Sequence, residues 1–156
     1  MALSVGTDAP NFTLLDQDKN PVNLSDYKGR KVVLAFFPAA FSGVCDKEMC
    51  TFQESLTRLN NANAAVIGIS ADLPFSNRAF KNMNALDFPI LSDWALEVAR
   101  NYDVIFNNFA GIDGLQRPSR AVYVVDEGGT IQYTEVTPSP GVEPNYDKVF
   151  EAVESM

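Results

Sequence analysis

The sequence contains no histidine, and it has only two cysteines and one tryptophan among its 156 residues. The absence of histidine excludes Ser-His-Asp and Cys-His catalysis, HExxH zinc sites and histidine-based pH switches. Two cysteines are too few for a disulfide scaffold or for a metal site built from cysteine alone, and we expect neither a metal nor a cofactor. No apolar run approaches the roughly 18 residues of a membrane-spanning helix.

Basic residues are also scarce. The chain has 12 Lys and Arg against 20 Asp and Glu, which gives a formal net charge of −8. This balance argues against binding to nucleic acid or to anionic lipid, so we expect no nucleic-acid partner and no membrane partner. Residues 1–10 have neither a cationic start nor an apolar core of signal length. We therefore expect a cytoplasmic protein, in which two retained cysteines are better suited to redox chemistry than to stapling a fold.

The composition and the pattern of apolar residues predict one α/β domain over residues 1–156, because no repeat or linker divides the chain. The order strand, helix, strand, helix, β-hairpin, helix is typical of the thioredoxin-like fold, with a central mixed sheet flanked by helices and, here, an added N-terminal β-hairpin. The spacing predicts a hairpin within residues 12–24, strands at 31–37, 64–70, 88–91, 121–125 and 131–136, and helices from 42–45 to about 60 and at 76–83, 93–102 and 145–155. The segment at 107–119, with two glycines and a proline, is predicted to be a loop.

Cys45 lies at the start of a predicted helix. Ser42 is a suitable N-cap, which makes Cys45 the third helical residue. The unpaired N–H groups and the positive dipole end of a first helical turn favour a thiolate over a thiol. Both a reactive nucleophile and a small buried hydrophobe are compatible with this position. Helical spacing also directs Cys45 toward the protein body, because it shares one apolar stripe with Met49, Phe52, Leu56 and Leu59.

The second cysteine, Cys50, follows five residues later and is rotated by roughly 140° around the same helix. Residues at this spacing have Cα atoms about 8–9 Å apart in an intact helix, whereas a disulfide needs them within about 7 Å. A bond between the two sulfurs therefore requires the first helical turns to unwind. The pair is compatible with a redox switch of two shapes, and the alternative is that Cys50 is an ordinary, partly buried thiol.

A second cluster, Arg117-Pro-Ser-Arg120, precedes the strand predicted at 121–125. In the thioredoxin-like fold this strand runs antiparallel beside the strand that leads into the cysteine helix. Arg120 is therefore expected beside the loop at 38–45, where a guanidinium would stabilise a thiolate. The alternative is a solvated arginine at a strand start.

These residues resemble the signature of the peroxiredoxins, Pro-x-x-x-Thr/Ser-x-x-Cys followed later by an arginine that opens a strand. The signature stands here as Pro38-Ala-Ala-Phe-Ser42-Gly-Val-Cys45, with Arg120 downstream. Residues 5–14 and 88–93 are also similar to the family. The pattern Ala-Phe-Ser-Gly-Val-Cys-x-x-Glu resembles AhpE-like members, and a second cysteine five residues later resembles the BCP/PrxQ type.

The resemblance implies a thiol-dependent peroxidase, an oxidoreductase that reduces hydrogen peroxide and organic hydroperoxides. The Cys45 thiolate would attack the peroxide and become a sulfenic acid. Ser42 would donate a hydrogen bond, Arg120 would compensate negative charge, and Pro38 would shield the sulfur from water. Glu48 would orient an arginine, or it would be an ordinary solvated helix carboxylate.

The resemblance also implies how the cycle closes. Cys50 would resolve the sulfenic acid as an intrachain disulfide, and a thioredoxin-type protein would reduce that disulfide. A homodimer is compatible with the family. Two alternatives remain open at this point. One is a thioredoxin-like thiol–disulfide oxidoreductase, although those enzymes place their cysteines three residues apart. The other is a redox sensor that binds a partner in its oxidised shape.

Overall fold

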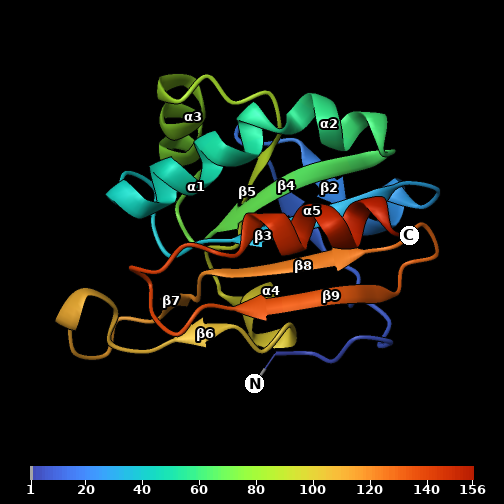
Figure 1. Cartoon of the computed structure of the whole chain (residues 1–156). Helices are drawn as coiled ribbons and strands as arrows, with labels where there is room; N and C mark the ends of the chain where they lie inside the picture. The colour runs from blue at the N-terminus through green and yellow to red at the C-terminus, as the bar shows by residue number, and fades with distance from the viewer. Residues whose placement is uncertain (1) are drawn as a thin grey trace.

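The computed structural model of the chain describes residues 2–156, and a seven-stranded sheet in the order β2-β1-β5-β4-β3-β8-β9 forms its centre (Figure 1). The strands of this sheet are β1 (Thr13–Leu15), β2 (Pro21–Asn23), β3 (Lys31–Phe36), β4 (Ala64–Ser70), β5 (Ile90–Ser92), β8 (Ala121–Val125) and β9 (Ile131–Val136). A second, two-stranded sheet pairs β6 (Ile105–Phe106) with β7 (Arg117–Pro118). The helices are α1 (Gly43–Glu54), α2 (Leu56–Asn61), α3 (Pro74–Met83), α4 (Glu97–Asn101) and α5 (Tyr146–Glu154), with 3-10 turns η1 (Leu24–Tyr27) and η2 (Phe109–Gly111).

The central strands β3, β4 and β8 are buried along their whole length, as continuous apolar runs covered on both faces require. β3 runs parallel to β4 and antiparallel to β8, which confirms the predicted mixed sheet. In the β3–β8 register, Phe36 lies opposite Ala121. This register brings the loop that follows β3 next to the residue that precedes β8, and it positions the site described below.

Two hydrophobic clusters cover the two faces of the sheet. One cluster contains the buried sides of α1, α2, α3 and α5, with Cys45 and Met49 among its members. The other contains α4 and the N-terminal segment. Within it the Tyr123 ring packs edge to face with the rings of Phe36 and Tyr102. In Figure 1, α5 lies in front of the sheet on the same side as α1 and α2. The N-terminal hairpin, β1 with β2, is confirmed.

Several predicted boundaries are wrong. The helix expected up to residue 60 is divided at Ser55, whose backbone angles of −98° and 4° leave the helical range. The helix expected at 93–102 begins only at Glu97, because Leu96 has a φ of 58°, in the left-handed region, and cannot belong to the helix. The Asp93 carboxylate accepts hydrogen bonds from the N–H groups of Val98 and Ala99 in the first turn. The segment at 107–119, expected as a loop, contributes η2 and β7. No helix between residues 2 and 156 is long and apolar enough to cross a membrane.

Candidate active site

The loop at 37–42 carries the chain from the end of β3 into α1, so the cysteine helix begins at the edge where β3 and β8 meet. Ser42 occupies the N-cap position, and its carbonyl oxygen accepts hydrogen bonds from the N–H groups of Cys45 (2.9 Å) and Asp46 (3.2 Å). Cys45 is the third residue of α1, as predicted, and its side chain is completely buried. A sulfur in this position lies close to the positive end of the helix dipole.

The Ser42 hydroxyl faces the sulfur instead of capping the helix. Its Oγ lies 2.7 Å from the Sγ of Cys45 and 3.0 Å from the carbonyl oxygen of Ala39, and it makes no capping hydrogen bond to a helix N–H. Ser42 therefore holds the predicted N-cap position, and its hydroxyl makes the contact with the sulfur that the family resemblance implies. Because a hydroxyl has one proton, it donates to one of these two acceptors at a time.

Arg120 is the cation of the site, and it is buried with about 1% of its side chain exposed. Its Nη2 lies 3.0 Å from the Sγ of Cys45, its Nη1 donates to Glu48 Oε1 at 2.9 Å, and its Nε donates to the carbonyl oxygen of Pro140 at 2.9 Å. Burial lowers the pKa of Arg120, but the negative charges of Glu48 and Cys45 outweigh burial and raise it. The group therefore stays a fixed cation beside the sulfur, where the strand topology predicted it.

Glu48 is completely buried, so the alternative of a solvated helix carboxylate is wrong. Burial raises the pKa of Glu48 to about 7, although Arg120 acts in the opposite direction. Its Oε2 is buried and has no hydrogen-bond partner among residues 2–156. When Cys45 is a thiolate, one guanidinium faces two acidic groups, and a proton on Glu48 leaves Arg120 to balance the sulfur alone. The signal for this burial is the spacing of three between Cys45 and Glu48, which places both on one helix face.

Pro38 is buried at the start of the loop. An ion pair that no motif in the sequence indicates holds this loop. Arg117 donates from Nε to the carbonyl oxygen of Pro38 at 2.7 Å and from Nη2 to Asp72 Oδ1 at 2.8 Å. Asp72 Oδ2 in turn accepts from the N–H of Ala40 at 2.8 Å. The loop is thus fixed on both sides of residue 39.

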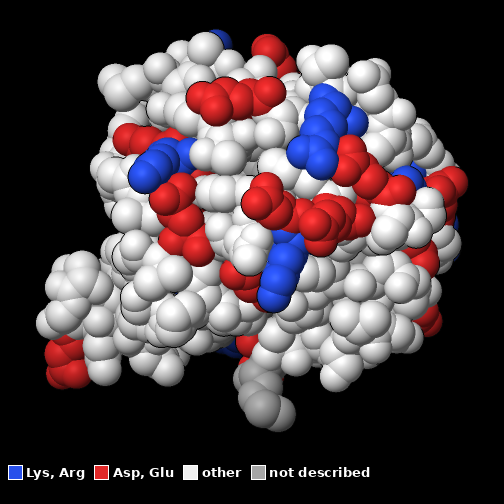
Figure 2. Space-filling model, viewed as in Figure 1, with Lys and Arg blue, Asp and Glu red and all other residues white. Residues whose placement is uncertain are grey.

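Cys50 lies on the same helix but has different surroundings from Cys45. It is a free, partly exposed thiol, and its Sγ lies 3.5 Å from Asn84 Oδ1 beside the end of α3. Burial raises the pKa of the Cys50 thiol, and the nearby carboxylates of Asp46 and Glu54 raise it further. Figure 2, which has the same view as Figure 1, shows acidic side chains over the face of the molecule turned to the viewer, with basic side chains among them. Both cysteines sit within the unbroken helix α1, each with its own partners.

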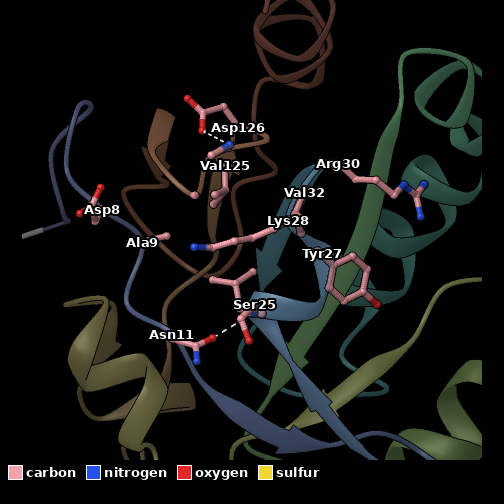
Figure 3. Close-up of a pocket in the computed structure, with 13 residues that line it drawn as sticks. Asp8, Ala9, Asn11, Ser25, Tyr27, Lys28, Arg30, Val32, Val125 and Asp126 are labelled. Carbon is pink, nitrogen blue, oxygen red and sulfur yellow. Dashed lines mark hydrogen bonds between the residues drawn. The ribbon is translucent and has the colours of Figure 1, made fainter.

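A cavity of about 290 Å³ lies at the other end of the sheet, where β3 begins and β8 ends (Figure 3). Its lining includes Lys28, Asn11 and Ser25 together with the apolar Val32 and Val125. It contains no cysteine, so the thiol chemistry belongs to the opposite end of the molecule. Among residues 2–156 there is no group of three His, Cys, Asp or Glu side chains that could hold a metal ion.

Comparison of the sequence with known proteins identifies the family of this chain. Residues 5–134 match the model of the AhpC/TSA family. The chain belongs to the AhpC/TSA family. It is 41% identical to a chloroplastic peroxiredoxin Q of Oryza sativa subsp. japonica over 131 residues, which cover 84% of this chain and 58% of the relative. It is 39% identical to a putative peroxiredoxin of Mycobacterium tuberculosis over 129 residues, which cover 83% and 82%.

A crystal structure of peroxidoxin BcpB from Mycobacterium tuberculosis has the same fold, with a TM-score of 0.87 at 27% identity over 99% of this chain and 98% of that one. These likenesses place this AhpC/TSA chain with the peroxiredoxins of the BCP/PrxQ type, the second of the two types that its sequence resembles. The chain spans 58% of the length of the rice relative.

The AhpC/TSA chain thus brings a buried sulfur together with two hydrogen-bond donors, one neutral and one cationic, at 2.7 Å and 3.0 Å. Such donors stabilise a thiolate and can also stabilise negative charge that develops on an atom the sulfur attacks. Of the predicted site residues, Ser42, Cys45, Glu48 and Arg120 form one connected cluster. Cys50 lies outside that cluster.

Proposed function

We propose that this chain is a thiol peroxidase that reduces hydrogen peroxide and organic hydroperoxides through Cys45. The observation that carries the proposal is the position of Arg120 Nη2, 3.0 Å from the Sγ of Cys45, together with Ser42 Oγ at 2.7 Å. Two donors that converge on one sulfur favour the thiolate, and the same donors suit the oxygen atoms of a peroxide. The family and its peroxiredoxin relatives support the same chemistry.

The proposed first step is a displacement at oxygen. The Cys45 thiolate attacks the terminal oxygen of the hydroperoxide, a sulfur–oxygen bond forms, and the oxygen–oxygen bond breaks. The terminal oxygen keeps its hydrogen, so the cysteine becomes a sulfenic acid. The other oxygen leaves as an alkoxide or hydroxide and takes up a proton to become alcohol or water. Arg120 stabilises the negative charge that moves from the sulfur to this leaving oxygen.

In the proposed second step the Cys50 thiolate attacks the sulfenic sulfur, the sulfur–oxygen bond breaks, and hydroxide leaves and takes up a proton to become water as the intrachain disulfide forms. Because both cysteines lie within the continuous helix α1, this step needs the first turns of α1 to unwind. A dithiol protein of the thioredoxin type then reduces the disulfide by exchange. The chain has no Cys-x-x-Cys pair of its own to serve as this reductant.

The test compares the chain with Cys45→Ser and Cys50→Ser. Cys45→Ser should consume no peroxide, whereas Cys50→Ser should complete one round of oxidation and then fail to turn over with thioredoxin. Peptide mass mapping after one equivalent of peroxide should find a Cys45–Cys50 bridge only in the unmodified chain. Equal loss of the first oxidation step in both variants would refute the assigned roles. Disulfide reduction without any peroxide consumption would favour a thioredoxin-like oxidoreductase instead.

A further inference from the structure

The ion pair of Asp72 and Arg117 joins three parts of the chain that are far apart in sequence. Asp72 follows β4, Arg117 lies in β7, and between them they bind the loop that follows β3. Arg117 holds the carbonyl oxygen of Pro38, and Asp72 holds the N–H of Ala40. The two side chains are only 17% and 20% exposed, so solvent screens this pair less than an open surface pair.

Asp72 is fixed to the sheet. Its N–H donates to Ser70 Oγ at 3.2 Å, and its carbonyl oxygen accepts from Asn77 Nδ2 at 3.4 Å and from the Ser92 hydroxyl. Ser70 and Ser92 are the last residues of β4 and β5. The backbone of Asp72 is therefore tied to three buried residues, Ser70, Asn77 and Ser92. Its carboxylate anchors the loop to this buried part of the sheet.

The loop itself needs such an anchor. Phe41 has a φ of 66°, in the left-handed region that a bulky residue rarely adopts. Phe41 is 46% exposed, and its ring packs edge to face with the ring of Phe80, with 5.6 Å between the two ring centroids. A backbone conformation of this kind persists only where surrounding contacts hold it. The contacts at Pro38 and Ala40 lie directly before it in the chain.

We propose that the Asp72–Arg117 pair is a latch that positions the loop beside Cys45 and opposes the unwinding of α1. This inference rests on the proposed peroxidase function. Unwinding the start of α1 pulls on the loop at 38–42, so the latch must yield before Cys50 can reach Cys45. The latch thus favours oxidation of Cys45 by peroxide and slows disulfide formation. A sulfenic acid that waits longer for Cys50 can react with a second peroxide, which forms sulfinic acid and releases water or alcohol.

The variants Arg117→Gln and Asp72→Asn test the latch, because each removes the ion pair with little change in size. Neither residue contacts the sulfur, so their expected effect is on position. We expect slower formation of the Cys45 sulfenic acid and about tenfold faster disulfide formation, as the loss of a charged hydrogen bond allows. The sulfinic fraction at equal peroxide should fall by a similar factor. Arg117→Lys keeps the charge toward Asp72 and should lie between Arg117→Gln and the unmodified chain.

Quenched-flow mixing with hydrogen peroxide, followed by mass spectrometry of the thiol, sulfenic, disulfide and sulfinic forms, measures all these quantities. Arg58→Gln is the matched control, since it removes the exposed ion pair with Glu154. The latch is refuted if Arg117→Gln and Asp72→Asn keep the control's ratio of disulfide to sulfinic acid, or if that ratio falls. If Arg117→Gln does not fold, Asp72→Asn and Arg117→Lys decide by the same ratio. Failure of the unmodified chain to consume peroxide would instead refute the proposed function.

Discussion

The guanidinium of Arg120 makes three contacts in three directions, and this geometry sets what can replace it. It reaches Cys45, Glu48 and the carbonyl oxygen of Pro140 at once. A lysine ammonium keeps the charge but lacks the planar fork that makes these contacts together. We predict that Arg120→Lys slows the oxidation of Cys45 by about a hundredfold, the usual size of losing one placed donor.

The measurement is the second-order rate constant of the reduced protein with hydrogen peroxide, taken by stopped flow. Arg78→Lys is the control, because Arg78 is exposed and its ion pair with Asp18 is loose, with 3.9 Å between Nε and Oδ1. A rate constant for Arg120→Lys equal to that of the control would remove the guanidinium from the chemistry.

Glu48 should make the stability of the protein depend on pH. Its pKa is about 7 in the folded protein against an ordinary 4.5. The folded state therefore binds more protons than the unfolded state between these values, so stability falls as pH rises from about 4.5 to about 7. Glu48→Gln cannot ionise and should escape this loss, which is on the order of 3 kcal/mol at most.

Urea unfolding at several pH values checks this. The free energy of unfolding of Glu48→Gln minus that of the unmodified chain should increase up to about pH 7 and then stay constant. A difference that does not change with pH would mean that Glu48 keeps its ordinary ionisation when folded.

The sequence predicts that Arg120 lies beside the loop before Cys45. The prediction needs only the positions of β3 and β8 and their antiparallel pairing in the thioredoxin-like fold. The spacing of Cys45 and Glu48 places both on one helix face, but it does not decide whether the carboxylate of Glu48 is buried. A helix carboxylate is buried or solvated according to whether a cation reaches it, and here that cation comes from a residue 72 positions away. The sequence does not predict the Asp72–Arg117 pair either, because its two members are 45 positions apart.

At the scale of elements, the approach of α1 to the sheet depends on Gly68 in β4. A Cβ atom at this position would lie 2.6 Å from Ile90 Cδ1 and 3.4 Å from Met49 Sδ. We predict that Gly68→Ala destabilises the protein by about 1–3 kcal/mol through overpacking. Ile90→Val removes the obstructing methyl group, so the double variant should recover part of that loss.

Denaturant unfolding of the two single variants and the double variant gives the coupling energy. Gly141→Ala is the control, since no described atom lies within 4 Å of its added Cβ. Strictly additive single effects would show that the contact with Ile90 does not limit the packing of β4.

Element boundaries show where sequence reasoning ends. Continuous apolar runs identified β3, β4 and β8 closely, because burial on both faces leaves no other pattern. The apolar stripe that begins at Cys45 also predicts correctly that Leu59 is buried. The stripe could not reveal the break at Ser55, because the side chains on either side of the break still face the same cluster.

At the scale of the whole molecule, the central sheet and α1 differ in how they are held. Residues in the interior of the sheet pair with strands on both sides and are covered by a cluster on each face. Helix α1 joins only one of those clusters, through the side that carries Cys45 and Met49. Local opening free energies follow such differences in burial and pairing, so α1 can open while the sheet stays intact.

This difference predicts where oxidation loosens the protein. After one equivalent of peroxide, amide hydrogen exchange should accelerate at residues 38–50, where the Cys45–Cys50 bridge requires unwinding. Exchange should stay slow in β3, β4 and β8, and in α2 as well, because the break at Ser55 separates α2 from α1. Cys50→Ser forms the sulfenic acid without a bridge, so its α1 should keep its protection under the same treatment.

A bridged protein that still protects residues 43–50 would contradict the required unwinding. Faster exchange throughout the sheet would instead show that α1 and the sheet open as one unit.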